Sequence, residues 1–222
     1  MSFINHLETA FQANSSRELA IPMENYMKNN FPFYGIKTDQ RRLILKKVWE
    51  ENQKEVKDNP REITLQLFAF EAREMHYCAI EILTKTLKKN YQVEDIQLIE
   101  KILTTHSWWD SVDTIAKYIL GQYLIEFPNE TKKVIQRFSD AENMWLNRSA
   151  LLFQLGYKQK TNAAILFEEC RKQSHSKEFF IQKAIGWALR EYAKCCPNKV
   201  KQFVAQSDLK PLSRKEALKN IS

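Results

Sequence analysis

Apolar side chains in this sequence recur every three or four residues, and the long stretches with this spacing themselves recur every 35 residues. Only four of the 222 residues are glycine, and no segment alternates strictly between apolar and polar residues. A spacing of three and four places apolar side chains on one face of an α-helix, whereas alternation is typical of strands. The chain is therefore predicted to be all-α.

The 35-residue spacing appears at several neighbouring positions of four long helical stretches. The residues in register are Cys78, Asp113, Arg148 and Lys183; Ala79, Thr114, Ser149 and Ala184; and Ile80, Ile115, Ala150 and Ile185. Shorter helical stretches are predicted between the long ones, near residues 92–103, 128–138, 161–173 and 197–206. Helix pairs repeated at this period build curved solenoids of the HEAT, armadillo or TPR type. We expect one domain of HEAT-like repeats over residues 1–222, with a concave face.

The composition is that of an ordinary soluble protein, with 44% hydrophobic and 27% charged residues. No apolar run approaches the roughly 18 residues that a membrane span needs, and the N-terminus lacks a signal-peptide pattern. The four cysteines form no CxxC pair, which favours reduced thiols. We expect a cytoplasmic monomer without membrane contact.

Positive charge is concentrated near the C-terminus. Residues 176–222 contain ten Lys or Arg and four Asp or Glu, so this segment carries +6 of the net charge of +7. A basic segment favours a polyanionic partner. A solvated surface that keeps the chain soluble explains the same charge equally well.

Serines followed three residues later by a carboxylate predict helix starts, because the serine caps a backbone N–H and the carboxylate lies near the positive helix end. On this interpretation Asp110 only helps to start a helix, whereas Asp113 lies in the second turn, beyond any capping role. Trp108 points about 100° away from Trp109 and is expected in the core. The three predicted pairs are Ser107 and Asp110, Ser139 and Glu142, and Ser213 and Glu216.

Residues from three repeats are predicted to face one strip of the surface. Trp109 lies one turn before Asp113. Two repeats later, Lys183 has the phase of Asp113, and Trp187 lies one turn after Lys183. Arg148 has the phase of Asp113 in the next repeat. We expect these ionisable residues to line the surface, because a solenoid core does not tolerate unpaired charges.

Two tryptophan faces, a carboxylate and a guanidinium suit a cationic aromatic ligand that is attached to phosphate. Tryptophan attracts a cation by about 0.5–2 kcal/mol, and arginine binds phosphate through paired hydrogen bonds. An alkylated DNA base such as N3-methyladenine or N7-methylguanine has these properties. The spacing leaves an alternative open, in which the tryptophans are core residues and the aspartate and arginine form an ordinary ion pair.

Five blocks, spread in order over most of the chain, closely resemble the bacterial AlkD family of DNA alkylation-repair glycosylases. The blocks are MKNNFPFYGIKTDQRR (27–42), SWWDSVDTIA (107–116), MWLNRSALLFQLGYKQK (144–160), KEFFIQKAIGWALREYAK (177–194) and PLSRKEALK (211–219). The resemblance implies a HEAT-like fold that grips duplex DNA in its concave face. It also implies hydrolysis of the N-glycosidic bond of cationic alkylpurines, and no cofactor or metal is implied.

The resemblance also assigns roles to individual residues. It implies that Asp113 is the catalytic carboxylate, that Trp109 and Trp187 are the two aromatic residues of the site, and that Arg148 contacts the DNA backbone. Asp113 is expected to stabilise an oxocarbenium-like sugar and to orient a water. The family implies a lesion that stays in or near the base stack, whereas glycosylases generally flip the base, and the residues leave this open.

The expected partner is duplex DNA that contains alkylated purines, so the protein is expected at the nucleoid when bound. Further phosphate contacts, which make affinity fall with salt, are expected from Lys183, Arg190 and Lys194. The alternative function is a non-catalytic helical-repeat protein that binds distorted or modified DNA. A protein–protein scaffold is less favoured, because the charges at one phase would then be incidental.

One position departs from the family pattern. Family members commonly have proline after Gly-Ile-x-Thr, whereas Asp39 follows Thr38 in this chain. The change adds a carboxylate to a predicted helix start near the expected DNA face.

Overall fold

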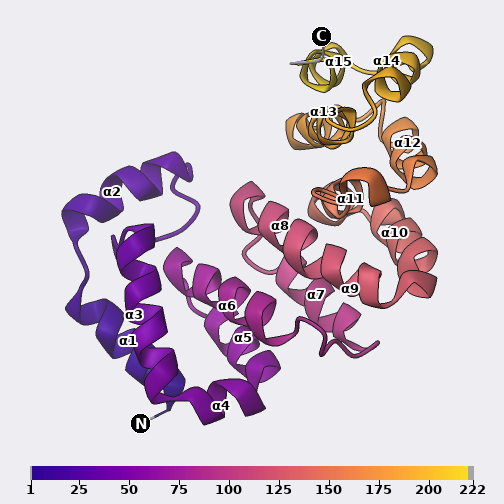
Figure 1. Cartoon of the computed structure of the whole chain (residues 1–222). Coiled ribbons are helices and arrows are strands. Elements are labelled where there is room, and N and C mark those ends of the chain that lie inside the picture. The colour runs from indigo at the N-terminus through magenta and orange to yellow at the C-terminus, as the bar shows by residue number, and fades with distance from the viewer. Residues whose placement is uncertain (1, 220–222) are drawn as a thin grey trace. The chain divides into compact units, whose positions relative to one another are not determined.

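The computed structural model describes residues 2–219, and all regular secondary structure in that range is helical, which confirms the predicted all-α class (Figure 1). None of these helices is both long and apolar enough to cross a membrane. The chain divides into two compact units, the first ending at Tyr91 and the second beginning at Gln92. A single domain over residues 1–222 stays a prediction.

Unit 1 consists of six helices around an apolar core. Helix α1 packs on α3, and α5 packs on α6. Serine hydroxyls cap the first two helices, since Ser2 accepts a hydrogen bond from the backbone N–H of Asn5 and Ser16 accepts one from that of Leu19. The helices are α1 (Phe3–Ala13), α2 (Arg17–Tyr26), α3 (Thr38–Glu51), α4 (Gln53–Asp58), α5 (Pro60–Phe68) and α6 (Arg73–Thr86).

Unit 2 contains the remaining helices, including the four shorter ones predicted between the long stretches. These are α7 (Asp95–Thr104), α10 (Thr131–Asp140), α12 (Ala163–Lys172) and α14 (Pro197–Gln206). Helix α8 (Trp109–Ile115) continues through a π-helical segment (Ala116–Leu120) into α9 (Gly121–Glu126). The others are α11 (Met144–Leu152), α13 (Phe179–Ala193) and α15 (Pro211–Ala217), with short 3₁₀ turns at Pro128–Glu130 and Lys158–Lys160.

The long helices of unit 2 place residues of one phase near one another. Helix α11 packs against both α8 and α13. Ile115, Ala150 and Ile185, which share a phase in these three helices, are all buried. The neighbouring phase, which contains Asp113 and Arg148, is thereby brought to one side of the three helices. The period and the curvature of a solenoid stay predictions.

The predicted start of α8 at Ser107 is wrong. The helix begins at Trp109, one residue later than predicted, and the Ser107 hydroxyl instead donates to a carbonyl in the last turn of α7, 2.6 Å away. Trp108 is extended at the helix boundary because its ring packs against Trp145 and Phe180, at 5.7 and 5.3 Å between centroids. This packing confirms that Trp108 is a packed residue, and Asp110 stays in the first turn.

The other two predicted capping pairs are also wrong, because both serines lie inside helices and face a neighbouring helix. Ser139 is buried in the last turn of α10, and α11 is capped by Asn143 instead. Ser213 is buried in α15, where its hydroxyl donates to the carbonyl of Gln182 in α13 at 3.0 Å. A serine before a carboxylate therefore marks helix contacts here rather than helix starts.

Candidate functional site

One cleft in unit 2 contains six of the seven predicted site residues. Its volume is about 410 Å³, which is within the range of small-molecule sites. We call it the Asp113 cleft. Helices α8, α11, α13 and α15 supply its walls, and Lys219 follows α15. The lining residues are Trp109, Asp113, Arg148, Phe179, Phe180, Lys183, Trp187, Arg190, Glu216 and Lys219.

Asp113 and Arg148 form a two-pronged ion pair in the wall of this cleft. The Nε of Arg148 donates to Oδ1 of Asp113 at 2.7 Å, and its Nη2 donates to Oδ2 at 2.8 Å. Its Nη1 donates to the backbone carbonyl of Phe180 in α13. Three helices thus fix the guanidinium, and the guanidinium fixes the carboxylate, since a bidentate pair defines both position and plane.

The phase of Arg148 predicted a position at the surface, and this prediction is wrong. Only 4% of its side chain is exposed, compared with 13% of the Asp113 side chain. The burial is tolerated because Asp113 and a backbone carbonyl accept hydrogen bonds from all three of its nitrogen atoms. A phosphate contact by Arg148 stays a prediction.

The environment of Asp113 acts on its pKa in two directions. Burial raises the pKa of this carboxyl group, and the hydrogen bonds and charge of Arg148 oppose the rise. The charge of Asp110 adds a smaller upward effect on the same pKa. A carboxyl group with a raised pKa in a cleft is a typical candidate for a functional role.

Aromatic side chains form much of the cleft. Trp109 is half-buried, and Trp187 is 40% exposed on α13. Phe180 and the largely exposed Phe179 line the same cleft. Neither phenylalanine was predicted as a site residue, although Phe180 lies three residues before Lys183 and therefore on the same face of the helix.

Two cations at the cleft share one carboxylate. Glu216 accepts a hydrogen bond from the Nζ of Lys183 at 2.9 Å and another from the Nη1 of Arg190 at 2.8 Å. The bond from Lys183, with a further contribution from Arg190, lowers the pKa of Glu216. The sequence interpretation missed Glu216, because it lies 33 residues after Lys183, outside the 35-residue register, and was explained as part of a helix start.

Lys194 is the one predicted site residue that does not line the cleft. It is exposed just after α13 and pairs with Glu191, three residues earlier. Its phosphate contact stays a prediction. No group of His, Cys, Asp and Glu within residues 2–219 is arranged to hold a metal ion.

Comparisons with known proteins identify the family. Residues 7–221 match the family model described as DNA alkylation repair enzyme. A solved structure described as a predicted DNA alkylation repair enzyme from Enterococcus faecalis is similar, with a TM-score of 0.86 and 31% sequence identity over 94% of this chain and 97% of the other. No curated protein gives a significant match. The chain belongs to the family of DNA alkylation repair enzymes.

Proposed function

We propose that this protein is a DNA glycosylase that hydrolyses the N-glycosidic bond of cationic alkylated purines, such as N3-methyladenine and N7-methylguanine, in duplex DNA. One observation carries the proposal: a carboxylate, Asp113, is fixed by Arg148 in a cleft that Trp109 and Trp187 also line. Membership of a DNA repair family supports DNA as the substrate.

The reaction needs a negative group beside the sugar. Alkylation at N3 or N7 gives the purine a positive charge, so the bond to C1′ breaks with its electron pair moving to the base, which leaves neutral. The positive charge then resides on the sugar, where the carboxylate of Asp113 stabilises it. Water adds to C1′ and loses a proton, for which Asp113 is the acceptor in this cleft. A positioned general base contributes about 10²–10⁴-fold, and fixed charge in a shielded cleft adds to it.

Arg148 acts on this chemistry through Asp113. Its two hydrogen bonds hold the carboxylate plane in one orientation, so the carboxylate does not have to reorganise when charge develops on the sugar. Arg148 is a positioning residue in this proposal. The tryptophans select the substrate, because each ring favours a cationic base over a neutral one by about 0.5–2 kcal/mol.

Lys183 and Arg190 are the proposed contacts to the DNA backbone. Both cations line the cleft and donate hydrogen bonds to Glu216, so a DNA phosphate has to compete with that carboxylate. Affinity for duplex DNA is expected to fall with salt, as it does when lysines and arginines release counterions from phosphates.

A second function is favoured by one contact. Both carboxylate oxygens of Asp113 accept hydrogen bonds from Arg148, as they also would in a structural ion pair without catalysis. The protein would then bind distorted or modified DNA without releasing a base.

Chromatography of free bases released from methylated duplex DNA separates the two functions. We expect release of N7-methylguanine and N3-methyladenine above the spontaneous rate and no release of unmodified purines, because only a cationic base leaves as a neutral molecule. Unmethylated duplex of the same sequence is the control. Binding without release would favour the non-catalytic function, and equal release of neutral purines would contradict the proposed selectivity.

A further inference from the structure

Unit 1 has a cleft of its own, which none of the predicted site residues lines. Its volume is about 420 Å³. It is bordered by the C-terminal half of α2, the segment between α2 and α3, the first turns of α3, and α6. Met23, Tyr26, Phe33 and Tyr77 make an apolar and aromatic wall, and Arg41 is the cation in it. We call it the Arg41 cleft.

Arg41 is a buried guanidinium without a hydrogen-bond partner for its Nε. Its side chain is only 8% exposed, and no described residue accepts a hydrogen bond from the buried Nε. The carboxylate in ion-pair range is that of Glu81, 3.8 Å from Nη2, which is too far for a hydrogen bond. That carboxylate is also shared with Arg42 at 3.8 Å and Lys85 at 2.7 Å. Burying a cation in this way is costly unless something else pairs with it.

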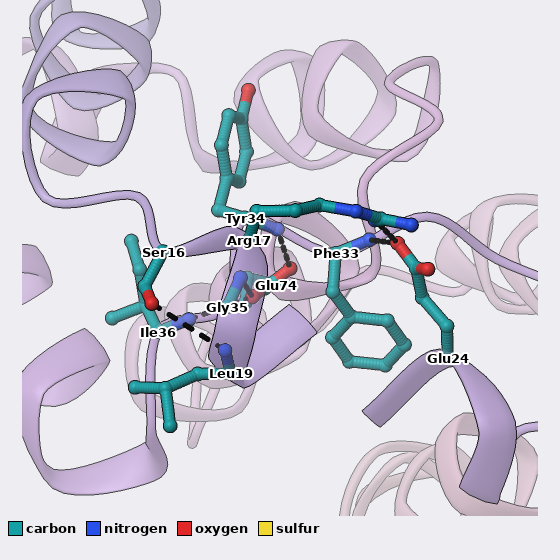
Figure 2. Close-up of polar contacts among 9 residues, drawn as sticks. All are labelled: Ser16, Arg17, Leu19, Glu24, Phe33, Tyr34, Gly35, Ile36 and Glu74. Atoms are coloured by element: carbon teal, nitrogen blue, oxygen red, sulfur yellow. Dashed lines mark hydrogen bonds and ion pairs between the residues drawn. The ribbon is translucent and has the colours of Figure 1, made fainter. Parts of the chain in front are cut away.

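Glu74, the acidic residue that lines this cleft, is engaged elsewhere. Its Oε1 accepts hydrogen bonds from the backbone N–H groups of Gly35 and Ile36 at 2.9 and 3.1 Å, and its Oε2 accepts one from that of Tyr34 at 3.1 Å. Figure 2 shows the carboxylate of Glu74 directed at this backbone segment. Both oxygens of Glu74 are therefore used by the backbone, and Glu74 fixes the wall of the cleft.

A second carboxylate completes this support. Glu24 in α2 accepts a hydrogen bond from the backbone N–H of Phe33 at 3.4 Å and one from Arg17 at 2.6 Å (Figure 2). Gly35 has a positive φ of 83°, and a Cβ there would lie 2.0 Å from the backbone oxygen of Ser16. The backbone at Gly35 therefore packs too closely against Ser16 for any side chain. The cleft is therefore formed in advance, which lowers the entropic cost of binding a ligand.

The backbone of the first turn of α3 adds positive potential to the same cleft, and Asp39, the acidic residue of that turn, does not line it. Thr38, the first residue of this 14-residue helix, lines the cleft, and no side chain caps the helix. Free N–H groups and the helix dipole make such an end favourable for an anion. Arg41 lies one turn further along, so the helix end and the guanidinium favour the same kind of ligand.

The remaining wall suits a ring or a sugar. Tyr26 is 67% exposed, whereas the guanidinium carbons of Arg41 and Arg73 lie over the ring of Tyr77, at 5.0 and 5.7 Å from its centroid. Bases stack on aromatic side chains whatever their sequence, at about 1–3 kcal/mol per base. A volume of about 420 Å³ is large enough for one nucleotide.

We infer that the Arg41 cleft binds a nucleotide, whose phosphate accepts hydrogen bonds from Arg41 and the first turn of α3 and whose base or sugar packs against Tyr26. The nucleotide is either free or one residue of a nucleic acid strand, and the phosphate chemistry is the same in both. The inference does not depend on base release in the Asp113 cleft.

Methionine methyl signals test binding inside this cleft. Met23 and Met27 line it, whereas Met144 lies in α11 of unit 2, so the full chain labelled with ¹³C at its methionine methyl groups contains its own internal control. We expect titration with deoxyadenosine 5′-monophosphate to shift the Met23 and Met27 signals to saturation. Absence of a saturable shift at both methionines would overturn the inference.

Two matched variants test the role of Arg41. Arg41→Leu is expected to weaken the titration at least tenfold, because the cation in the cleft is lost. Arg42→Leu removes the same charge from a neighbouring side chain that is 61% exposed and does not line the cleft, and it is expected to titrate like the wild type. Equal affinities of Arg41→Leu and wild type would overturn the assignment. Arg41→Gln, also neutral, carries the same expectation if the leucine variant does not fold.

Three further ligands test which part of the nucleotide is bound and whether the nucleotide is free or belongs to a strand. Inorganic phosphate is expected to shift the same signals at higher concentration, and deoxyadenosine to bind at least tenfold more weakly than its monophosphate. Deoxyadenosine that binds as well as the monophosphate would contradict a phosphate site. A tetradeoxyadenylate that binds more tightly than the monophosphate supports a strand as the source, and weaker binding supports a free nucleotide.

Discussion

Arg148 and Arg41 are both more than nine-tenths buried, and each lines a cleft, but only one has a partner of its own. Arg148 donates to both oxygens of Asp113 and to a backbone carbonyl. Arg41 has a shared carboxylate at 3.8 Å, the Tyr77 ring at 5.0 Å from its Cζ, and an Nε without a hydrogen-bond partner. In the first cleft the arginine holds a carboxylate, which is the group proposed to act on the ligand, whereas in the second cleft the arginine itself is proposed to bind the ligand. The Asp113 cleft is therefore suited to a cation and the Arg41 cleft to phosphate.

Matched leucine substitutions of the two arginines should have the largest effect and test the difference between the two clefts directly. Arg148→Leu leaves the carboxylate of Asp113 without its partner, so we expect the free energy of unfolding to fall by about 3 kcal/mol. Arg41→Leu replaces a buried cation that donates no hydrogen bond to its carboxylate at 3.8 Å by an apolar group, so the free energy of unfolding is expected to stay equal or to rise by up to about 1 kcal/mol.

Urea unfolding followed by circular dichroism measures both variants against the wild type, and an unchanged m value shows that the comparison is between similar transitions. A loss in Arg41→Leu as large as that in Arg148→Leu would show that Arg41 is satisfied within the protein. The contrast between the two clefts would then be wrong.

The pH dependence of base release should show a smaller effect. Asp113 acts when ionised, and burial raises its pKa above the usual value of 3.8. Release is therefore expected to fall as the pH decreases, and the fall should begin at a higher pH than for an exposed aspartate. Arg148 opposes the rise in this pKa, so Arg148→Leu should move the fall to still higher pH.

Single-turnover rates across the acidic range, corrected at each pH for spontaneous loss of the base, check this expectation. A rate that stays constant down to the range in which exposed aspartates titrate would contradict a role for the ionised carboxylate. An identical midpoint in Arg148→Leu would separate Arg148 from the titration of Asp113.

The fold class could be predicted because helical spacing is a local property. Few glycines and apolar residues at three and four were enough for an all-α chain, and the shorter helices between the long ones were located correctly. Helix boundaries were harder, because the ring of Trp108 packs against Trp145 and Phe180 and holds the residue before α8 extended. No capping pattern contains that tertiary contact.

The convergence of Trp109, Asp113, Arg148 and Trp187 followed from the 35-residue spacing, and the structure places these residues in one cleft. Their chemical roles stay proposals. Glu216 was missed because it lies outside this register. The Arg41 cleft was missed as well, because segments near residues 22–41 and 74–77 form it without any repeated spacing.

The rate constant for base release at saturating protein tests the proposed role of Asp113 most directly. It is measured in a single turnover on duplex DNA containing N7-methylguanine, for the wild type, Asp113→Asn and the exposed Asp208→Asn as the matched control. We predict a loss of at least about 100-fold in Asp113→Asn, with DNA binding retained, and no change in Asp208→Asn. Equal rates for Asp113→Asn and the wild type would contradict the proposed mechanism.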